Sequence, residues 1–153
     1  MTKKITGIIL GFDFGMKYIG VATGQRISQT ATPLTCLPAK DGIPNWADIV
    51  ALVDSWQPER LLVGIPLNMD GTTQQMTYCA QKFANRLQQH TNMAVITVDE
   101  RLSTWEARNR LLATTKHGKQ NFNKLNAMAA AILVEQWLHD NNGSGEFDGA
   151  EVR

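Results

Sequence analysis

The chain has 153 residues, of which 43% are hydrophobic and 19% charged, and a formal net charge of +1. This composition is typical of one soluble globular domain with a sizeable core, and it excludes an intrinsically disordered chain. The small net charge gives no global signal for nucleic acid, so any basic surface must be local.

The first predicted element is a buried strand, residues 5–10, that leads into an acidic residue. Asp13 follows it among apolar neighbours, where a carboxylate costs free energy unless something positive pairs with it. Gly15 and Gly20 bracket a tight hairpin with Lys17 in its turn, and residues 18–23 form the returning strand. Asp13 is therefore either a turn residue that caps its own backbone or a functional carboxylate on a rigid hairpin.

The next elements alternate between strands and helices. Residues 30–37 predict a short third strand, which Pro33 places at a sheet edge, and Asp41-Gly42 predicts a turn. A helix opens at Pro44 and Asn45 and ends at Gln57-Pro58, and its spacing predicts one apolar face made of Trp46, Ile49, Val50, Val53 and Trp56. The continuous apolar run 60–66 predicts a central parallel strand buried on both faces.

The second half of the chain continues this alternation. We expect a helix over residues 73–90 and a buried strand over 93–98 that runs into Asp99 and Glu100. Ser103-Thr104-Trp105-Glu106 fits a capping box that opens a helix to about Ala113. Residues 114–122 predict a polar loop, and residues 123–140 predict the last helix.

These elements predict an α/β fold. We expect a mixed five-stranded sheet, made of a three-stranded antiparallel meander and two parallel strands, flanked by helices. Residues 1–142 form one domain, and residues 143–153 are expected to be a disordered tail or a cloning remnant. Right-handed crossovers bring the carboxyl ends of the strands that end at Asp13, Pro66 and Val98 to one edge. Four polar residues then converge there: Asp13, Asn68, Asp70 and Glu100.

The carboxylates at this edge point to metal chemistry. Asp99 and Glu100 are adjacent, so their side chains face opposite sides of the sheet and only one joins Asp13. Two carboxylates from neighbouring strands, without a histidine or cysteine ligand set, suit a hard cation such as Mg²⁺. Two such ions can clamp the attacking and leaving oxygens of a phosphodiester. The alternative is that Asp99-Glu100-Arg101 is a surface turn with a local ion pair.

A local basic segment points to nucleic acid. Residues 101–124 contain six Lys or Arg residues and one acidic residue, Glu106, which gives a local charge of +5. Such a segment can lie along a phosphate backbone, although a solvated helix face followed by a disordered loop has the same composition. The two cysteines, Cys36 and Cys79, have no metal-ligand spacing and suit a reducing compartment. Since no stretch is long enough to span a membrane, we expect a cytoplasmic protein.

Three motifs in order, at residues 13–22, 64–71 and 99–104, resemble the YqgF family, whose members are described as Holliday-junction resolvases or pre-16S rRNA nucleases. The resemblance runs from about Ile5 to Leu138 and implies a ribonuclease H-like fold. It also implies a bacterial cytoplasmic nuclease that uses Mg²⁺ or Mn²⁺ and trims the 5′ end of 16S rRNA precursor. The resemblance further implies that Asp13 and Glu100 are the first two catalytic, metal-binding carboxylates. We expect nucleic-acid contacts from Lys17, Arg26, Asn68, Arg101, Thr104, Lys116, Lys119 and Lys124.

The third carboxylate of the family is replaced in this chain. The family usually has an aspartate shortly before an alanine-rich run in the last helix, and here Asn126 precedes the run 127–133. Asn126 shares a helix face with Ala130, Leu133 and Trp137, so it should point toward the sheet. The resemblance implies that it takes the place of the third catalytic, metal-binding residue. An amide oxygen can ligate magnesium but brings no charge.

Three functions from different classes remain open. The first is a metal-dependent nuclease acting on rRNA precursor or on branched DNA, as a monomer or a homodimer. The second, motivated by Asn126, is a nuclease-like module that binds nucleic acid without cleaving it. The third is half of an actin-like ATPase, which also holds metal and phosphates on an Asp-x-Gly hairpin but needs a second domain of similar size.

Overall fold

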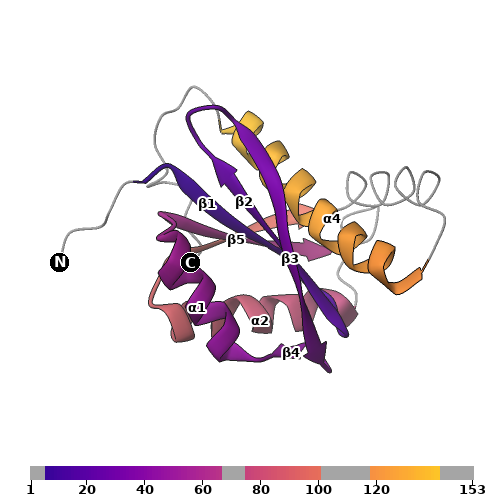
Figure 1. Cartoon of the computed structure of the whole chain (residues 1–153). Coiled ribbons are helices and arrows are strands. Elements are labelled where there is room, and N and C mark those ends of the chain that lie inside the picture. Colours follow the sequence, from indigo (N-terminus) through magenta and orange to yellow (C-terminus); the bar gives the residue numbers. More distant parts are fainter. Residues whose placement is uncertain (1–5, 67–74, 101–117, 142–153) are drawn as a thin grey trace.

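The chain, described by a computed structural model over residues 6–66, 75–100 and 118–141, places helices on both faces of a mixed sheet (Figure 1). Within these residues the sheet has six strands in the order β4-β3-β2-β1-β5-β6. The strands are β1 (Ile8–Asp13), β2 (Tyr18–Gln25), β3 (Thr30–Lys40), β4 (Ile43–Pro44), β5 (Arg60–Pro66) and β6 (Val95–Glu100). The described helices are α1 (Trp46–Trp56), α2 (Gln75–Thr91) and α4 (Gly118–Asp140).

The parallel half of the sheet is arranged as predicted. β1, β5 and β6 lie side by side, so their carboxyl ends share one edge. In this register Asp13 lies beside Gly64 of β5, and Gly64 lies beside Val98 of β6. On the other side of β1, the antiparallel strand β2 places Gly20 opposite Asp13. β5 is buried from Arg60 to Ile65, as expected for a central strand covered on both faces.

Alternate residues of β1 pack on opposite faces of the sheet. Phe12 belongs to the core under α1 and α2, where it meets Phe83 of α2 edge-on with ring centroids 6.0 Å apart. Ile9 belongs to a second core under α4, together with Ala130 and Val134. By the same alternation Asp13 lies on the α4 face. Figure 1 shows α4 on one side of the strands and α1 and α2 on the other.

The helix α4 approaches β2 closely because two positions on that strand have no side chain. A Cβ atom added at Gly20 would collide with the backbone carbonyl of Asn126. One added at Gly24 would collide with the side chain of Val134 instead. The helix backbone therefore rests directly on the sheet at Gly20, next to Asp13.

The prediction of five strands was wrong, because within the described residues a sixth strand, β4, extends the edge. β3 is also longer than predicted and runs to Lys40, where Asp41 and Gly42 form a two-residue hairpin turn with φ of 52° and 81°. Positive φ at both positions is the geometry that Asp-Gly favours. β4 has two residues and pairs with Ala39 and Lys40, so it is too short to leave a periodic signal.

The helix α1 begins and ends where the sequence predicts. The Asn45 side chain accepts a hydrogen bond from the Ala47 N–H, and Gln57 closes the helix in the left-handed conformation at φ 48°. The predicted apolar face was wrong in part, since Val50 and Trp56 are 41% and 37% exposed. The helix lies on the surface of the domain and packs through a narrower stripe centred on Ile49.

The other two described helices agree with the predictions to different extents. The spacing of apolar residues predicts a buried face made of Met76, Ala80, Phe83, Ala84 and Leu87, and α2 buries the last four, while Met76 is partly buried. α4 begins at Gly118, so the prediction that residues 118–122 belong to a loop was wrong. The sequence there is polar, and no apolar periodicity marks that first part of the helix. The helix expected at residues 103–113 lies outside the described residues.

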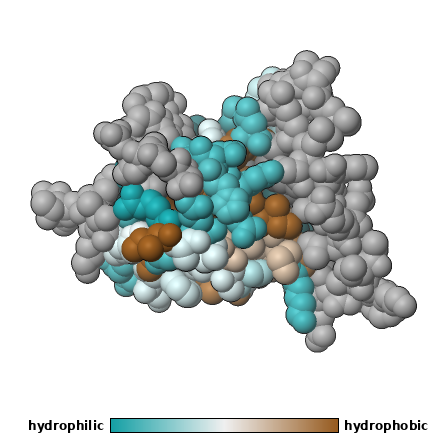
Figure 2. Space-filling model, turned by 90° about the horizontal axis from the view of Figure 1, so that it is seen from above, coloured by the Kyte–Doolittle hydropathy of each residue, from teal (hydrophilic) through white to brown (hydrophobic). Residues whose placement is uncertain are grey.

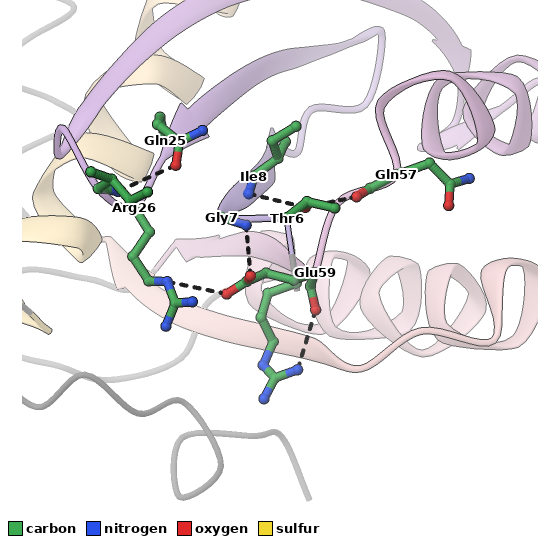
Figure 3. Close-up of polar contacts among 9 residues, drawn as sticks. Thr6, Gly7, Ile8, Gln25, Arg26, Gln57 and Glu59 are labelled. Atoms are coloured by element: carbon green, nitrogen blue, oxygen red, sulfur yellow. Dashed lines mark hydrogen bonds and ion pairs between the residues drawn. The ribbon is translucent and has the colours of Figure 1, made fainter. Parts of the chain in front are cut away.

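A buried carboxylate joins three segments at the end of the sheet opposite Asp13 (Figure 3). Glu59, the residue before β5, accepts a hydrogen bond of 2.8 Å from the Gly7 N–H and forms an ion pair of 3.3 Å with the Arg26 guanidinium. Its own N–H donates to the Ile8 carbonyl at 2.8 Å. The polar contacts of Glu59 therefore bind β5 to the start of β1 and to the turn after β2.

The described surface seen from above is mainly hydrophilic, with separate small hydrophobic areas rather than one continuous patch (Figure 2). Among the described helices, none is both long and apolar enough to cross a membrane.

Candidate functional site

The site is built around Asp13, the last residue of β1, whose side chain is only 3% exposed. Its partners on both neighbouring strands are glycines, Gly20 on β2 and Gly64 on β5. Neither neighbour carries a side chain, so the carboxylate is not crowded by the strands beside it. A buried carboxylate between two glycines, at the edge where parallel strands end, is a candidate position for binding a ligand.

A transverse row of residues extends from Asp13 toward the edge of the sheet. Gly20 lies between Asp13 and Cys36 of β3, and α4 rests on Gly20 through the backbone of Asn126. Burial and the Asp13 carboxylate both raise the pKa of the Cys36 thiol above its ordinary value. The thiol therefore stays protonated at neutral pH. The charge of Asp13 acts on Cys36 across the intervening strand β2.

The backbone of Glu100 ends β6 on the same edge of the sheet. Its register partner on β5 is Pro66. Val98, two residues earlier on β6, packs against the core under α4. The expectation that Asp13 and Glu100 come from neighbouring strands was wrong, because β5 lies between β1 and β6. Asp13 ends β1 and Glu100 ends β6, and β5 separates these two strands.

Asn126 lies where the helix meets the sheet. It is half-buried on α4, and its backbone carbonyl faces Gly20, the register partner of Asp13. The structure therefore brings the helix position that was matched to the third carboxylate next to the row that contains Asp13. Its role in catalysis or metal binding remains a prediction.

Four of the eight residues predicted to contact nucleic acid lie within the described ranges. Lys17 is exposed in the hairpin after Asp13, and its carbonyl accepts a hydrogen bond of 2.8 Å from the Ala39 N–H. Lys119 and Lys124 belong to the N-terminal part of α4, on the side of the molecule where β1 and β5 end (Figure 1). Arg26 is at the opposite end of the sheet, in its ion pair with Glu59. The remaining four lie outside the described residues: Asn68, Arg101, Thr104 and Lys116.

Sequence reasoning missed a cavity of about 420 Å³ between β3 and α4. Pro33 to Cys36 form one wall, and Asn123, Lys124, Ala127 and Met128 form the other. The walls come from segments almost ninety residues apart, so no local pattern marks them. Among these residues, the sequence predicts a binding role only for Lys124.

Asp13 and the residues near it offer oxygen atoms, which are the ligands of hard divalent cations. The Asp13 carboxylate and the Asn126 amide are oxygen ligands, which Mg²⁺ and Mn²⁺ prefer. The neighbouring Cys36 thiol is kept protonated by burial and by Asp13, which raise its pKa, so it does not compete as a thiolate ligand. Over the described ranges, no three His, Cys, Asp or Glu side chains cluster as a metal-ligand set.

Comparison with known proteins identifies the family. The profile of the family described as "RuvX: Holliday junction resolvase" matches residues 7–140. A protein of Shewanella oneidensis named "Putative pre-16S rRNA nuclease" is 46% identical over 135 residues, which cover 88% of this chain and 96% of that relative. A protein of Salmonella arizonae with the same name is 47% identical over 134 residues, which cover 88% and 97%.

The fold has solved counterparts at low sequence identity. The structure described as "T. thermophilus RuvC in complex with Holliday junction substrate" matches with a TM-score of 0.55 at 13% identity, over 91% of this chain and 98% of that one. A second structure of Thermus thermophilus RuvC matches with a TM-score of 0.50 at 12% identity, over 90% and 97%. The predicted ribonuclease H-like fold is thereby confirmed. With the profile and the relatives spanning nearly the whole domain, the chain belongs to the RuvX family, also called YqgF, as its three motifs predicted.

Proposed function

We propose that this protein is a cytoplasmic, divalent-metal-dependent nuclease that hydrolyses phosphodiester bonds in structured nucleic acid, with the 5′ end of 16S rRNA precursor as its main substrate. The observation that carries the proposal is the buried carboxylate of Asp13 between Gly20 and Gly64, at the edge where the parallel strands end. Membership of a nuclease family supports the reaction type. The names of the relatives support the substrate.

In the proposed site, Asp13, Glu100 and Asn126 would hold Mg²⁺ or Mn²⁺. Such an ion, when bound, stabilises negative charge on the phosphate and activates a water molecule for attack. Asp13 supplies an oxygen ligand whose position is fixed by the sheet, since β1 is hydrogen-bonded on both sides. The neutral amide of Asn126 would come from α4, whose backbone carbonyl at this residue faces Gly20. Lys17, Lys119 and Lys124 would hold the flanking phosphates by charge rather than by reading bases.

Two other functions follow from particular observations. The family description favours four-way DNA junctions as an alternative substrate. The neutral Asn126, at the position matched to a carboxylate, favours a module that binds nucleic acid with little or no cleavage. The basic residues would bind nucleic acid in both of these alternatives. Each alternative is compatible with a monomer or with a homodimer.

The deciding experiment compares the protein with Asp13→Asn on labelled rRNA precursor, single strands and four-way junctions, each with Mg²⁺ or Mn²⁺. Asn has nearly the same volume as Asp, so the fold should survive while metal-dependent cleavage falls below detection. Cleavage that persists unchanged in the variant would rule out Asp13 as the metal ligand. Binding without cleavage by both proteins would select the binding module.

A further inference from the structure

The cavity between β3 and α4 has the size and chemistry of a ligand site. Its volume of about 420 Å³ lies within the range of small-molecule and cofactor sites. Pro33, Leu34, Ala127 and Met128 make the lining mostly apolar. Lys124 contributes a cation, and the described lining includes no acidic residue. A ligand with a flat, weakly polar body and an anionic end fits this combination.

The local backbone helps to shape the cavity. Val21 of β2 pairs with Thr35, whereas the next residue, Ala22, pairs with Pro33, so Leu34 is an extra, bulged residue in β3. A β-bulge bends its strand and increases the local twist, and bulges are common beside active sites. The bulge therefore lies in the wall of the cavity.

The cavity is also adjacent to the proposed catalytic row. Cys36 lies in its wall and belongs to the same row as Asp13, two strands away, which corresponds to about 10 Å between the strands. Ala127 and Lys124 flank Asn126 on α4. Asp13 and the cavity therefore lie on either side of Gly20, and both adjoin the part of α4 that contains Asn126.

We propose that the cavity binds one nucleoside of the substrate strand, with its base against Pro33, Leu34 and Met128 and a flanking phosphate at Lys124. This inference rests on the proposed nuclease function and adds to it a subsite for an unstacked base. Apolar side chains commonly hold an extruded base, and such contacts tolerate any sequence because every base has a flat face. The subsite therefore selects substrates that are single-stranded or easily unstacked next to the scissile bond.

The two cysteines give a direct test. Cys36 lies in the cavity, whereas Cys79 lies on α2 across the sheet, and both are half-buried. The protein is alkylated without metal at mildly alkaline pH, alone or with a short RNA single strand, and a matched strand of abasic sugar-phosphate serves as the control. We expect the RNA to slow alkylation of Cys36 severalfold, the abasic strand to have little effect, and Cys79 to react equally in all three. Equal protection by both strands, or none, would overturn the base subsite.

A second variant tests the same point without relying on the thiol. Met128→Glu places a charge at the partly exposed mouth of the cavity and should weaken binding of the RNA strand by at least about fivefold. Gln136→Glu makes the same change of charge on an exposed position of α4 outside the cavity, and should alter binding far less. Equal weakening by the two variants would contradict the proposal. Cleavage is measured separately. Protection of Cys36 without cleavage would refute only the proposed nuclease function, and cleavage without protection of Cys36 would refute only the proposed base subsite.

Discussion

At the scale of single residues, the site depends on Gly20 as much as on Asp13. The glycine lets the backbone of α4 rest on β2 and so sets the height of Asn126 above the carboxylate. A side chain at this position has no room, because the atoms it would meet belong to the helix backbone rather than to the flexible end of a side chain. The helix as a whole would have to move.

We predict that Gly20→Ala destabilises the protein by about 1–3 kcal/mol, the usual range for overpacking. It should also raise the metal concentration needed for cleavage, because α4 carries Asn126 away from Asp13. The measurements are urea unfolding and a metal titration of cleavage. Gly24→Ala is the matched control: the added Cβ collides with the Val134 side chain and not with the backbone of α4, and Gly24 pairs with Ile9 rather than with Asp13. If the two variants have the same metal requirement, the position of α4 does not tune the site.

Asn126 leads to a second prediction at this scale. In the proposed site, two divalent ions and a phosphate would need more negative charge than Asp13 and Glu100 supply, so Asn126→Asp should lower the metal concentration for half-maximal cleavage and raise the rate. Manganese should serve the unmodified protein better than magnesium, since it generally binds nitrogen and oxygen sites more tightly. The added carboxylate should slightly lower the melting temperature of the metal-free protein, because like charges then share one site.

Metal titrations of cleavage by both proteins, with metal-free melting curves, test this. An unchanged metal requirement in Asn126→Asp would place residue 126 outside the metal shell. Inactivity of both proteins at saturating manganese would instead favour the binding module.

At the scale of elements, β1, β2 and β5 are held together at the end remote from Asp13 by Glu59 (Figure 3). Its carboxylate is buried and receives both the Gly7 N–H and the Arg26 guanidinium. A buried carboxylate with two such partners stabilises the fold mainly because the partners lose their acceptor when it is removed. Arg26, predicted to contact nucleic acid, has a structural partner here.

We predict that Glu59→Ala lowers the free energy of unfolding by about 2–4 kcal/mol. Glu59→Gln should cost less, since an amide oxygen still accepts the Gly7 N–H. Neither variant should change the affinity for nucleic acid, because Glu59 lies at the far end of the sheet. Arg26→Ala distinguishes the two roles of Arg26: a loss of stability without a loss of affinity supports the ion pair as its function. The reverse result would support the predicted nucleic-acid contact.

At the scale of the whole molecule, the net charge of +1 hides an uneven distribution, with a charge of +5 over residues 101–124. Contacts of Lys and Arg with phosphates release counterions, so each contact steepens the dependence of affinity on salt. We predict that changing Lys116 and Lys119 to Ala weakens binding similarly for unrelated sequences and reduces the salt slope by about 0.7 per lost contact on single strands. Binding at several salt concentrations measures this.

Lys40→Ala combined with Lys82→Ala is the control for the charge, since both lysines are exposed outside the basic segment. If this pair flattens the salt dependence as much as the Lys116 and Lys119 pair, the basic segment is an ordinary solvated surface.

The sequence by itself determined the elements and the family. The strands that end at Asp13 and Pro66, the cap at Asn45 and the buried face of α2 follow from local apolar periodicity and from residues that start or stop a helix. The three motifs predicted the RuvX family, and the profile and relatives confirmed it. The site residues remain predictions, since the motifs only match their positions.

Only the tertiary structure decided how distant segments meet. It inserted β5 between the strands that carry Asp13 and Glu100, and it set Gly20 between Asp13 and Cys36. It also gave Arg26 its partner on β5 and opened the cavity beside β3. These features depend on strand order, on register and on the closeness of helix to sheet. The packing of the whole core determines these long-range features, and local periodicity in the sequence carries no information about them.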